Sequence, residues 1–181
     1  MKTLNIVIAG LGNVGSALVD SINNNNQLFI NKSSIHINII GISASNRNKK
    51  RSCDISKYQW YDNPIDLINL KNVDVLVELI GTEKGISLEL IKSALEKKIH
   101  VVTGNKAMLA KHGNELFQIA EINNVLLLYE AAVAGGIPVI KTVKNILFLN
   151  KIKKISGILN GTTNYILTKM QEENLSFAEA L

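Results

Sequence analysis

The stretch LNIVIAGLGNVG, residues 4–15, joins an apolar run to a loop that contains three glycines. Leu4–Ala9 predicts a buried strand, and GLGNVG (10–15) has the G-x-G-x-x-G spacing of a dinucleotide-binding loop. That spacing alone is a weak signal. Here it directly follows a strand and opens a segment of helical periodicity over 14–22, which is the context that the motif requires.

The three glycines of this loop have separate physical roles. Gly10 permits a tight turn, Gly12 lets the backbone approach a pyrophosphate, and Gly15 lets the helix pack on the strand. The start of the helix offers amide donors and the positive end of its dipole to an anion. We therefore favour dinucleotide binding over a glycine-rich turn without a ligand, with contacts from Gly10, Gly12, Asn13, Val14 and Gly15.

Beyond the loop, short apolar runs alternate with segments of helical periodicity. Further strands are predicted near 35–42, 73–80, 100–103 and 125–129, and helices over 86–95 and 109–120. Several runs are apolar at consecutive positions, as in parallel strands covered on both faces. The alternation predicts an α/β fold, a Rossmann-like doubly wound parallel sheet. The polar stretch SINNNNQLFINKSS (21–34) suggests a long connection before the second strand.

The character of the chain changes at AAVAGGIP, residues 131–138, where small residues and a glycine pair gather. We place a domain boundary here, with a dinucleotide-binding domain over 1–130 and the start of an α+β substrate and dimerisation domain over 131–181. Pro138 suits the first turn of a helix over about 139–149. A strand near Lys153–Ile158, the turn LNGTTN (159–164) and a helix through about Gln171 should follow.

Composition excludes several classes of protein. The 181 residues are 46% hydrophobic and 19% charged, which suits a globular chain with one sizeable core. No run is long and apolar enough to span a bilayer, and Cys53 is the single cysteine, so we expect a cytoplasmic protein without disulfides. The net charge of +5 is spread along the chain without a nucleic-acid motif, so nucleic acid is not an expected partner.

The end of the second strand bears on the choice of cofactor. An NAD site usually has an acidic residue there for the ribose hydroxyls, whereas this chain has Ser43–Ser45. The cationic residues Arg47, Lys49, Lys50 and Arg51 follow, and they could meet a 2′-phosphate. A solvated loop would explain the lysines but not the absent acid. We therefore expect NADP(H) to be preferred, with NAD(H) as the alternative, and we include Arg47 in the cofactor site.

Lys106 lies where a buried strand ends and a helix begins, in VVTGNKAMLA (101–110). Ligands of doubly wound sheets lie beyond the carboxyl ends of the strands, so this position faces the cofactor side. The helix dipole disfavours a cation at a helix start, unless a bound anion or a developing oxyanion is its partner. An exposed lysine that happens to open a helix is the alternative.

Further stretches follow GLGNVG in order: LVELIG (76–81), VVTGNKAMLA (101–110), YEAAVAGGIPVI (129–140) and GILNGTTNYIL (157–167). Together they resemble the homoserine dehydrogenases over essentially the whole chain. The resemblance implies a nicotinamide-dependent enzyme that interconverts aspartate 4-semialdehyde and homoserine, on the route to threonine and methionine. It also implies a homodimer for the full-length protein.

The resemblance assigns roles to particular residues. Lys106 matches the family's lysine beside nicotinamide and substrate, although Gly104 departs from the alanine or proline that the family usually has there. Gly81, the last residue of LVELIG, and Thr82, the next residue, also belong to the expected cofactor-binding set. Gly161 and Thr162 match the family's G-T turn that contacts the amino acid substrate.

The family also binds a monovalent cation, such as sodium, through carbonyl oxygens at the hinge. By position these belong to Glu130, Val133, Gly135 and Ile137. Backbone carbonyls suit a hard cation, and a glycine pair lets the chain curl them inward. A bare hinge is the alternative.

Two other functions remain open from the sequence. A phosphorylating semialdehyde dehydrogenase would need a cysteine nucleophile in its catalytic region, and Cys53 lies in the wrong part of the chain. A non-catalytic NADP(H)-binding module is the second. The three histidines lack ligand spacing and are interpreted as ordinary strand or helix residues.

The last residues carry a helix-start signal. Ser176 and Glu179 form a capping-box pattern, yet the sequence ends two residues later, too soon for a stable isolated helix. We therefore expect the N-terminal portion of a homoserine dehydrogenase, which lacks half of the active site. Its residues 139–181 should be poorly packed, with Ile146, Leu147, Ile158 and Leu159 exposed.

Overall fold

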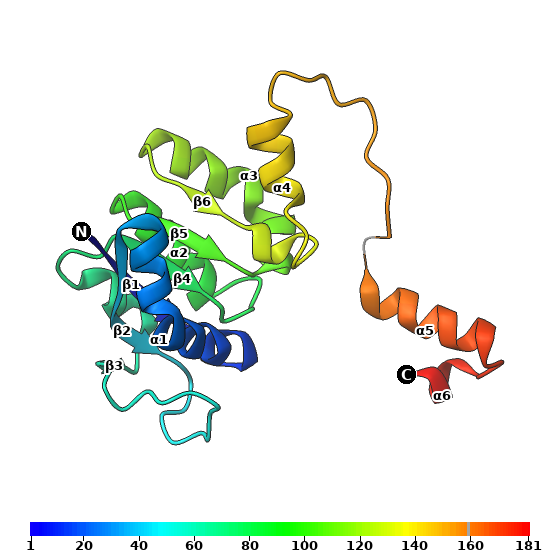
Figure 1. Ribbon diagram of the computed structural model, residues 1–181, viewed down its shortest axis with the longest axis horizontal. Coiled ribbons are helices and arrows are strands. Elements are labelled where there is room, and N and C mark those ends of the chain that lie inside the picture. Colours follow the sequence, from blue (N-terminus) through cyan, green and yellow to red (C-terminus); the bar gives the residue numbers. More distant parts are fainter. Residues whose placement is uncertain (159) are drawn as a thin grey trace. The chain divides into compact units, whose positions relative to one another are not determined.

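A computed structural model describes residues 1–158 and 160–181, and its centre is a parallel sheet (Figure 1). The strand order is β3-β2-β1-β4-β5-β6. This order reverses direction beside β1, as in doubly wound dinucleotide-binding folds, and it confirms the predicted fold class. The strands are β1 (Lys2–Ala9), β2 (Ile35–Ser43), β3 (Trp60–Tyr61), β4 (Val75–Glu78), β5 (His100–Thr103) and β6 (Leu127–Leu128).

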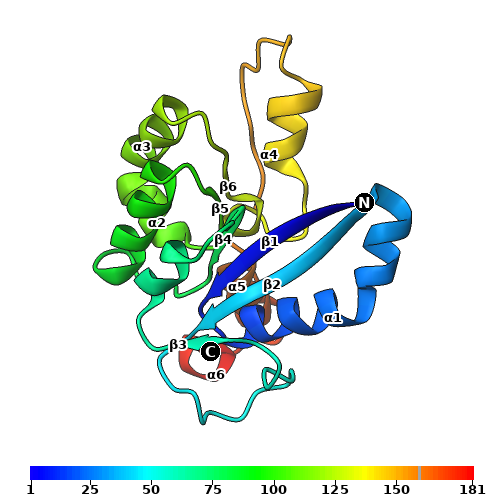
Figure 2. The same cartoon turned by 90° about the vertical axis from the view of Figure 1, so that its left-hand side faces the viewer.

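Helices cover both faces of the sheet (Figure 2). On one face, α1 (Asn13–Ser33) packs Val19 and Ile22 against apolar residues of β1 and β2. On the other face lie α2 (Ile86–Glu96), α3 (Lys106–Ile122) and a 3-10 helix over Pro64–Asn69. Burial on both faces explains why the central strands are apolar at consecutive positions.

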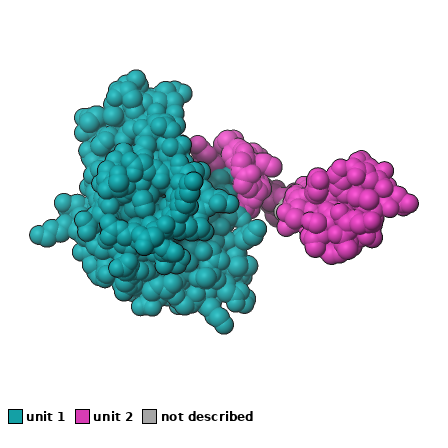
Figure 3. Space-filling model, turned by 90° about the horizontal axis from the view of Figure 1, so that it is seen from below, with its two compact units in different colours: residues 1–132 teal, residues 133–181 magenta. Residues whose placement is uncertain are grey.

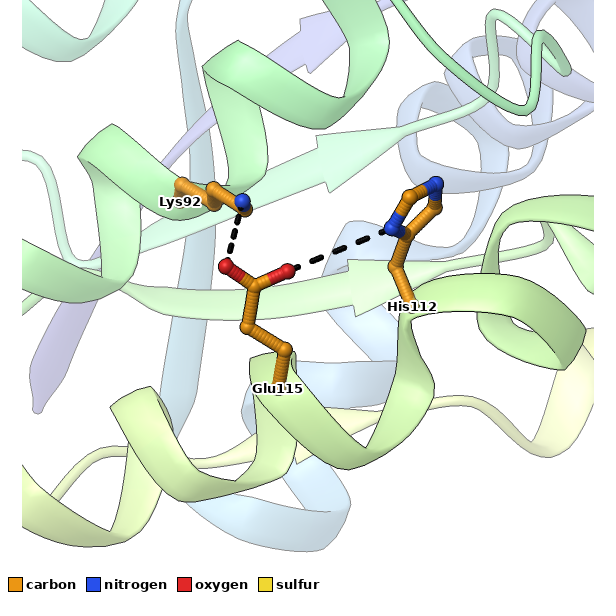
Figure 4. Close-up of polar contacts among 3 residues, drawn as sticks. All are labelled: Lys92, His112 and Glu115. Atoms are coloured by element: carbon orange, nitrogen blue, oxygen red, sulfur yellow. Dashed lines mark hydrogen bonds and ion pairs between the residues drawn. The ribbon is translucent and has the colours of Figure 1, made fainter.

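A polar cluster joins α2 to α3 at the surface (Figure 4). Lys92 of α2 places its Nζ 2.5 Å from Oε1 of Glu115 on α3, and Nδ1 of His112 lies 4.0 Å from the other carboxylate oxygen. These side chains are partly exposed, so the cluster contributes less to stability than the apolar contacts beneath it.

The polar stretch 21–34 is not a connection, and that prediction is wrong. It forms the second half of α1, and the C-cap residue, Ser34, has the left-handed conformation (φ 58°). Asparagine runs are typical of loops, because their side chains compete for backbone hydrogen bonds. Here the side chain of Asn26 donates to the carbonyl of Ile37 at 2.9 Å and accepts from its N–H at 3.3 Å. This pair of bonds ties the helix to β2.

Residues 1–132 form one compact unit and residues 133–181 form a second (Figure 3). It contains α4 (Val139–Lys141), a π-helical stretch (Thr142–Ile146), α5 (Gly161–Glu172) and α6 (Phe177–Ala180). The predicted helix over 139–149 is thus helical through 146. The predicted strand near Lys153–Ile158 is wrong, because residues 151–156 find no strand partner among the described residues.

Several large apolar side chains of the second unit are exposed. Ile146, Leu147 and Ile158 are 67%, 37% and 75% exposed, as predicted, while Leu159 lies outside the described residues. The predicted capping box is also present, with Glu179 accepting from the N–H of Ser176 at 2.9 Å, and the hydroxyl of Ser176 also donates to this carboxylate at 2.6 Å. These bonds, led by that of the hydroxyl, hold the pKa of Glu179 below its ordinary value.

Across the described residues, no helix combines the length and the apolar character that crossing a bilayer requires.

Candidate functional site

The glycine loop between β1 and α1 has two closed positions and one open position. Gly10 has φ 103°, and a Cβ there would lie 2.4 Å from the carbonyl carbon of Leu79. A Cβ on Gly15 would lie 2.0 Å from the carbonyl oxygen of Gly10. A Cβ on Gly12 would meet no atom within 4 Å. The fold itself therefore requires Gly10 and Gly15, whereas the absence of a side chain at Gly12 leaves open space in which a ligand could bind.

The start of α1 presents its backbone to this space. Gly12 is the N-cap and has no side chain to satisfy the first amides of the helix. Asn13, Val14 and Gly15 are the first helical residues, and the side chain of Val14 is 64% exposed. A helix start without a side-chain cap is suited to an anionic group.

A cavity of about 350 Å³ lies beside the loop, at the carboxyl ends of β1, β2 and β4. This is the position at which doubly wound sheets bind their ligands. The cavity has an apolar wall and a charged side with two cations, Lys49 and Arg51, and one acid, Asp62. Its lining residues are Gly10, Leu11, Gly12, Ser43, Ala44, Ser45, Lys49, Arg51, Asp62, Pro64, Leu79, Ile80 and Ile86.

The cations after β2 do not all line the same concavity, and Lys50 lines a small one beside Gly12 and Asn13 that Lys49 and Arg51 also border. Lys49 and Arg51 line the cavity of the glycine loop, together with the serines that replace the usual acid. Arg47 lines a separate concavity, beside Asp54 and Trp60. Sequence reasoning could not rank these cations, because their order along an irregular loop does not determine which way they point.

Arg51 braces the loop that carries these cations. Its Nε donates to the carbonyl of Leu11 at 3.3 Å, which links it to the glycine loop. Its other nitrogens donate to the carbonyls of Asn46 (2.6 Å) and Lys49 (2.9 Å), and its guanidinium lies 5.4 Å from the ring centre of Trp60. Lys49 has no such bonds among the described residues, so its ammonium is the more available cation.

Gly81 and Thr82 belong to the loop that follows β4. Gly81 has φ 87° and donates its N–H to Oε1 of Glu78 at 3.3 Å. The carbonyl of Thr82 accepts from the side chain of Asn105 at 2.7 Å. Glu78 is fully buried, and the sequence interpretation assigned it no role. The sequence could have pointed to Glu78, because a carboxylate inside the apolar run VDVLVELI needs hydrogen-bond donors from elsewhere in the fold.

Lys106 is the first residue of α3 and follows β5 at the same edge of the sheet as the cavity. Asn105 caps the helix by accepting from the N–H of Met108 at 3.2 Å. The side chain of Lys106 is exposed, and it makes no hydrogen bond or ion pair with any residue over 1–158 or 160–181. The fold thus leaves this ammonium group available to a ligand.

The remaining predicted site residues lie at the hinge and in the second unit. Glu130 belongs to a 3-10 helix over Glu130–Ala132, and Val133, Gly135 and Ile137 begin the second unit. Ala134 and Gly136 are left-handed (φ 52° and 86°), and the carbonyl of Ile137 already accepts from the N–H of Val139 at 2.8 Å.

Gly161 and Thr162 form the first turn of α5 rather than a free turn. Asn160 caps that helix by accepting from the N–H of Thr163 at 2.7 Å. A Cβ on Gly161 would meet no atom within 4 Å, and Thr162 is exposed. Both residues therefore present a helix start and a hydroxyl to the surface of their unit.

Comparison with known proteins identifies the family. Residues 10–130 match the sequence profile described as homoserine dehydrogenase, NAD binding domain. Residues 138–181 match the profile described as homoserine dehydrogenase. The chain belongs to the homoserine dehydrogenase family. The first match includes the glycine loop, the residues that line the cavity and Lys106.

Individual relatives agree with this assignment. The chain is 41% identical to the homoserine dehydrogenase of Neisseria gonorrhoeae and 37% identical to that of Bacillus subtilis, in each case over all of this chain. It spans only 41% and 42% of the length of those proteins.

Solved structures of homoserine dehydrogenases share the fold. One from Thiobacillus denitrificans has a TM-score of 0.92 at 34% identity, over 100% of this chain and 42% of that one. A hyperthermophilic archaeal homoserine dehydrogenase in complex with NADPH has a TM-score of 0.81 at 29% identity, over 98% of this chain and 59% of that one.

Proposed function

We propose that this chain forms the cofactor domain (1–130) and the start of the substrate domain (131–181) of an NADP(H)-dependent homoserine dehydrogenase. The reaction is the reversible reduction of aspartate 4-semialdehyde to homoserine. The observation that carries the proposal is the open space at Gly12, bordered by an uncapped helix start and by a cavity with two cations. Membership of the family supports the choice of reaction.

The residues of the glycine loop fit a dinucleotide. The amides of Asn13, Val14 and Gly15 at the start of α1 would bind the pyrophosphate, while Gly12 lets the backbone approach it and Gly10 makes the tight turn before it. Gly81 and Thr82 would border the cofactor from the loop after β4. When bound, the nicotinamide supplies or accepts the hydride.

Lys106 is the proposed catalytic residue. Reduction of an aldehyde leaves negative charge on its oxygen, and a nearby ammonium stabilises that charge and can donate a proton. The side chain of Lys106 has no partner among the described residues, which supports a role toward a ligand. In the substrate domain, Gly161 and Thr162 would contact the amino acid through the start of α5.

Three further features are proposals from the family likeness. A monovalent cation such as sodium would bind the carbonyls of Glu130, Val133, Gly135 and Ile137. The left-handed residues Ala134 and Gly136 support this proposal, because they bend the backbone between these carbonyls. A homodimer of the full-length protein and a cytoplasmic location complete the proposal.

The activity is tested in a chimera, in which residues 1–181 replace the matching part of the Neisseria gonorrhoeae protein. We expect the chimera to oxidise NADPH when aspartate 4-semialdehyde is added. The reaction is measured as the loss of NADPH absorbance. The unmodified Neisseria gonorrhoeae protein is the control for assay and folding. A folded chimera that binds NADPH without oxidising it would instead indicate a non-catalytic cofactor-binding module.

We expect the chain to bind NADPH at least about tenfold more tightly than NADH, because Lys49 and Arg51 line the cavity beside Ser43–Ser45 and outnumber its one acid, Asp62. Lys49→Ala should remove most of this difference in affinity without weakening the binding of NADH. Arg47→Ala, an alanine variant in the same loop but in a separate concavity, is the matched control and should change the ratio less. Equal dissociation constants for the two cofactors in the wild-type chain would rule out the preference.

A further inference from the structure

Glu78 is a buried charged group to which the proposed mechanism gives no part. It ends β4 in the middle of the sheet, where it is paired in register with Ala9 of β1 and Thr103 of β5. Its side chain is fully buried. A carboxylate in such a place is tolerated only where hydrogen-bond donors replace its lost water. The identity of those donors therefore indicates what the residue holds in place.

Two donors come from the backbone of the loop after β4. Oε1 of Glu78 accepts from the N–H of Ile80 at 2.9 Å and from that of Gly81 at 3.3 Å. Ile80 lines the cavity beside the glycine loop, and Gly81 is held in a left-handed conformation. The carboxylate thus fixes the backbone of one wall of the cavity.

The other two donors are hydroxyl groups. Ser87 donates to Oε1, and Thr103 donates to Oε2 at 2.6 Å. Because a carboxylate can only accept, both hydroxyls must donate to it, and their oxygens remain as acceptors. The oxygen of Ser87 accepts from Nδ2 of Asn105 at 3.3 Å, and that of Thr103 accepts from the backbone N–H of Asn105 at 3.0 Å. The carboxylate thereby sets the direction of the two hydroxyl bonds.

The network has two arms, one from Glu78 through Ser87 and one from Glu78 through Thr103, and both end at Asn105. Its Nδ2 also donates to the carbonyl of Thr82 at 2.7 Å, and its Oδ1 caps α3 through the N–H of Met108. The next residue is Lys106, the first residue of α3. One buried network therefore connects the cavity wall to the backbone that carries the proposed catalytic lysine.

We propose that Glu78 is a positioning residue that acts through Thr103 and Asn105. It holds the loop over 79–82 and the start of α3 in fixed places before the cofactor arrives. A site ordered in advance binds its ligand more tightly, because less freedom is lost on binding. The inference rests on the proposed function, since it concerns the same cofactor site.

The substitution pair at Thr103 separates positioning from packing. Thr103→Val keeps the side-chain volume and removes the hydroxyl, whereas Thr103→Ser keeps the hydroxyl and removes a buried methyl group. We expect Thr103→Val to weaken NADPH binding about tenfold, while Thr103→Ser binds within about threefold of wild type. If the residue served packing alone, Thr103→Ser would be the more damaging change.

Ser87 provides a second, independent variant on the other arm. Ser87→Ala should weaken NADPH binding in the same direction as Thr103→Val, and the two effects should not add, because both arms end at Asn105. Ser93→Ala is the matched control, since it makes the same change on the same helix, and Ser93 lines a different concavity. It should leave the affinity unchanged.

The experiment measures two quantities on the 181-residue chain: the dissociation constant for NADPH, and amide hydrogen exchange at Gly81 and Asn105 without ligand. Thr103→Val should speed exchange at Asn105 about tenfold, since that amide loses its acceptor. If wild type binds NADPH and Thr103→Val binds it equally well, the positioning role of Glu78 is overturned while the proposed function stands. If wild type fails to bind NADPH, the proposed function fails, and the inference fails with it.

Discussion

Gly15→Ala should destabilise the cofactor domain by about 3 kcal/mol or more. The added Cβ would lie 2.0 Å from the carbonyl oxygen of Gly10, and that oxygen belongs to backbone which cannot rotate away like a side chain. To make room, α1 must move away from β1, and Val19 and Ile22 would lose packing in the core. The measurement is the free energy of unfolding in urea, with the transition followed by circular dichroism.

Gly113→Ala is the matched control for this prediction. Gly113 is also a helical glycine, in α3, and a Cβ there would lie 3.5 Å from the ring of Phe117, an ordinary contact. Since alanine favours helix over glycine by about 1 kcal/mol, Gly113→Ala should be neutral or stabilising. A Gly15→Ala variant as stable as wild type would show that residue 15 does not lie as close to the carbonyl oxygen of Gly10 as described.

Lys106→Met should lower turnover by about a thousandfold in the chimera described above, and leave the fold intact. The loss follows from removing the ammonium that would stabilise the developing oxyanion. The fold should survive because the Nζ of Lys106 touches no partner in the described part of the chain, and the side chain is exposed. The measurement is kcat for NADPH oxidation with aspartate 4-semialdehyde, together with Tm.

Lys111→Met is the matched control, since it makes the same change one and a half turns further along α3. Lys111 is bonded to Glu83 at 2.7 Å at the surface, and an exposed ion pair of this kind contributes little. Its kcat should stay within about twofold of wild type. Retained turnover in Lys106→Met would refute the catalytic assignment, and another group would have to stabilise the oxyanion.

The sequence predicted the centre of the sheet and the glycine loop well, because their causes are local. Consecutive apolar residues in β1 and β4, and the glycine spacing in 10–15, follow from burial on both faces and from steric room. The second half of α1 was missed because its asparagines favour loops locally. Tertiary bonds from Asn26 to β2 help to hold it as a helix.

The site was less predictable than the fold, because its geometry depends on long-range contacts. Arg47, Lys49 and Arg51 were equivalent in sequence, and only the bonds of Arg51 to Leu11 and to its own loop show how that segment is arranged. Glu78 was overlooked for the same reason. Its partner Thr103 is 25 residues away, and no local pattern announces their bond.

The central claim is that the open space at Gly12 receives a nicotinamide dinucleotide, and a titration tests it most directly. NADPH is added to the wild-type chain and to Gly12→Val, and binding is followed by NADPH fluorescence, with Tm of each protein as the folding control. Because no atom lies within 4 Å of a Cβ at this position, Gly12→Val should fold normally. Our account predicts saturable binding of one NADPH per wild-type chain, and affinity lower by about a hundredfold in Gly12→Val. Equal affinity of the two proteins, or no binding by wild type, would contradict it.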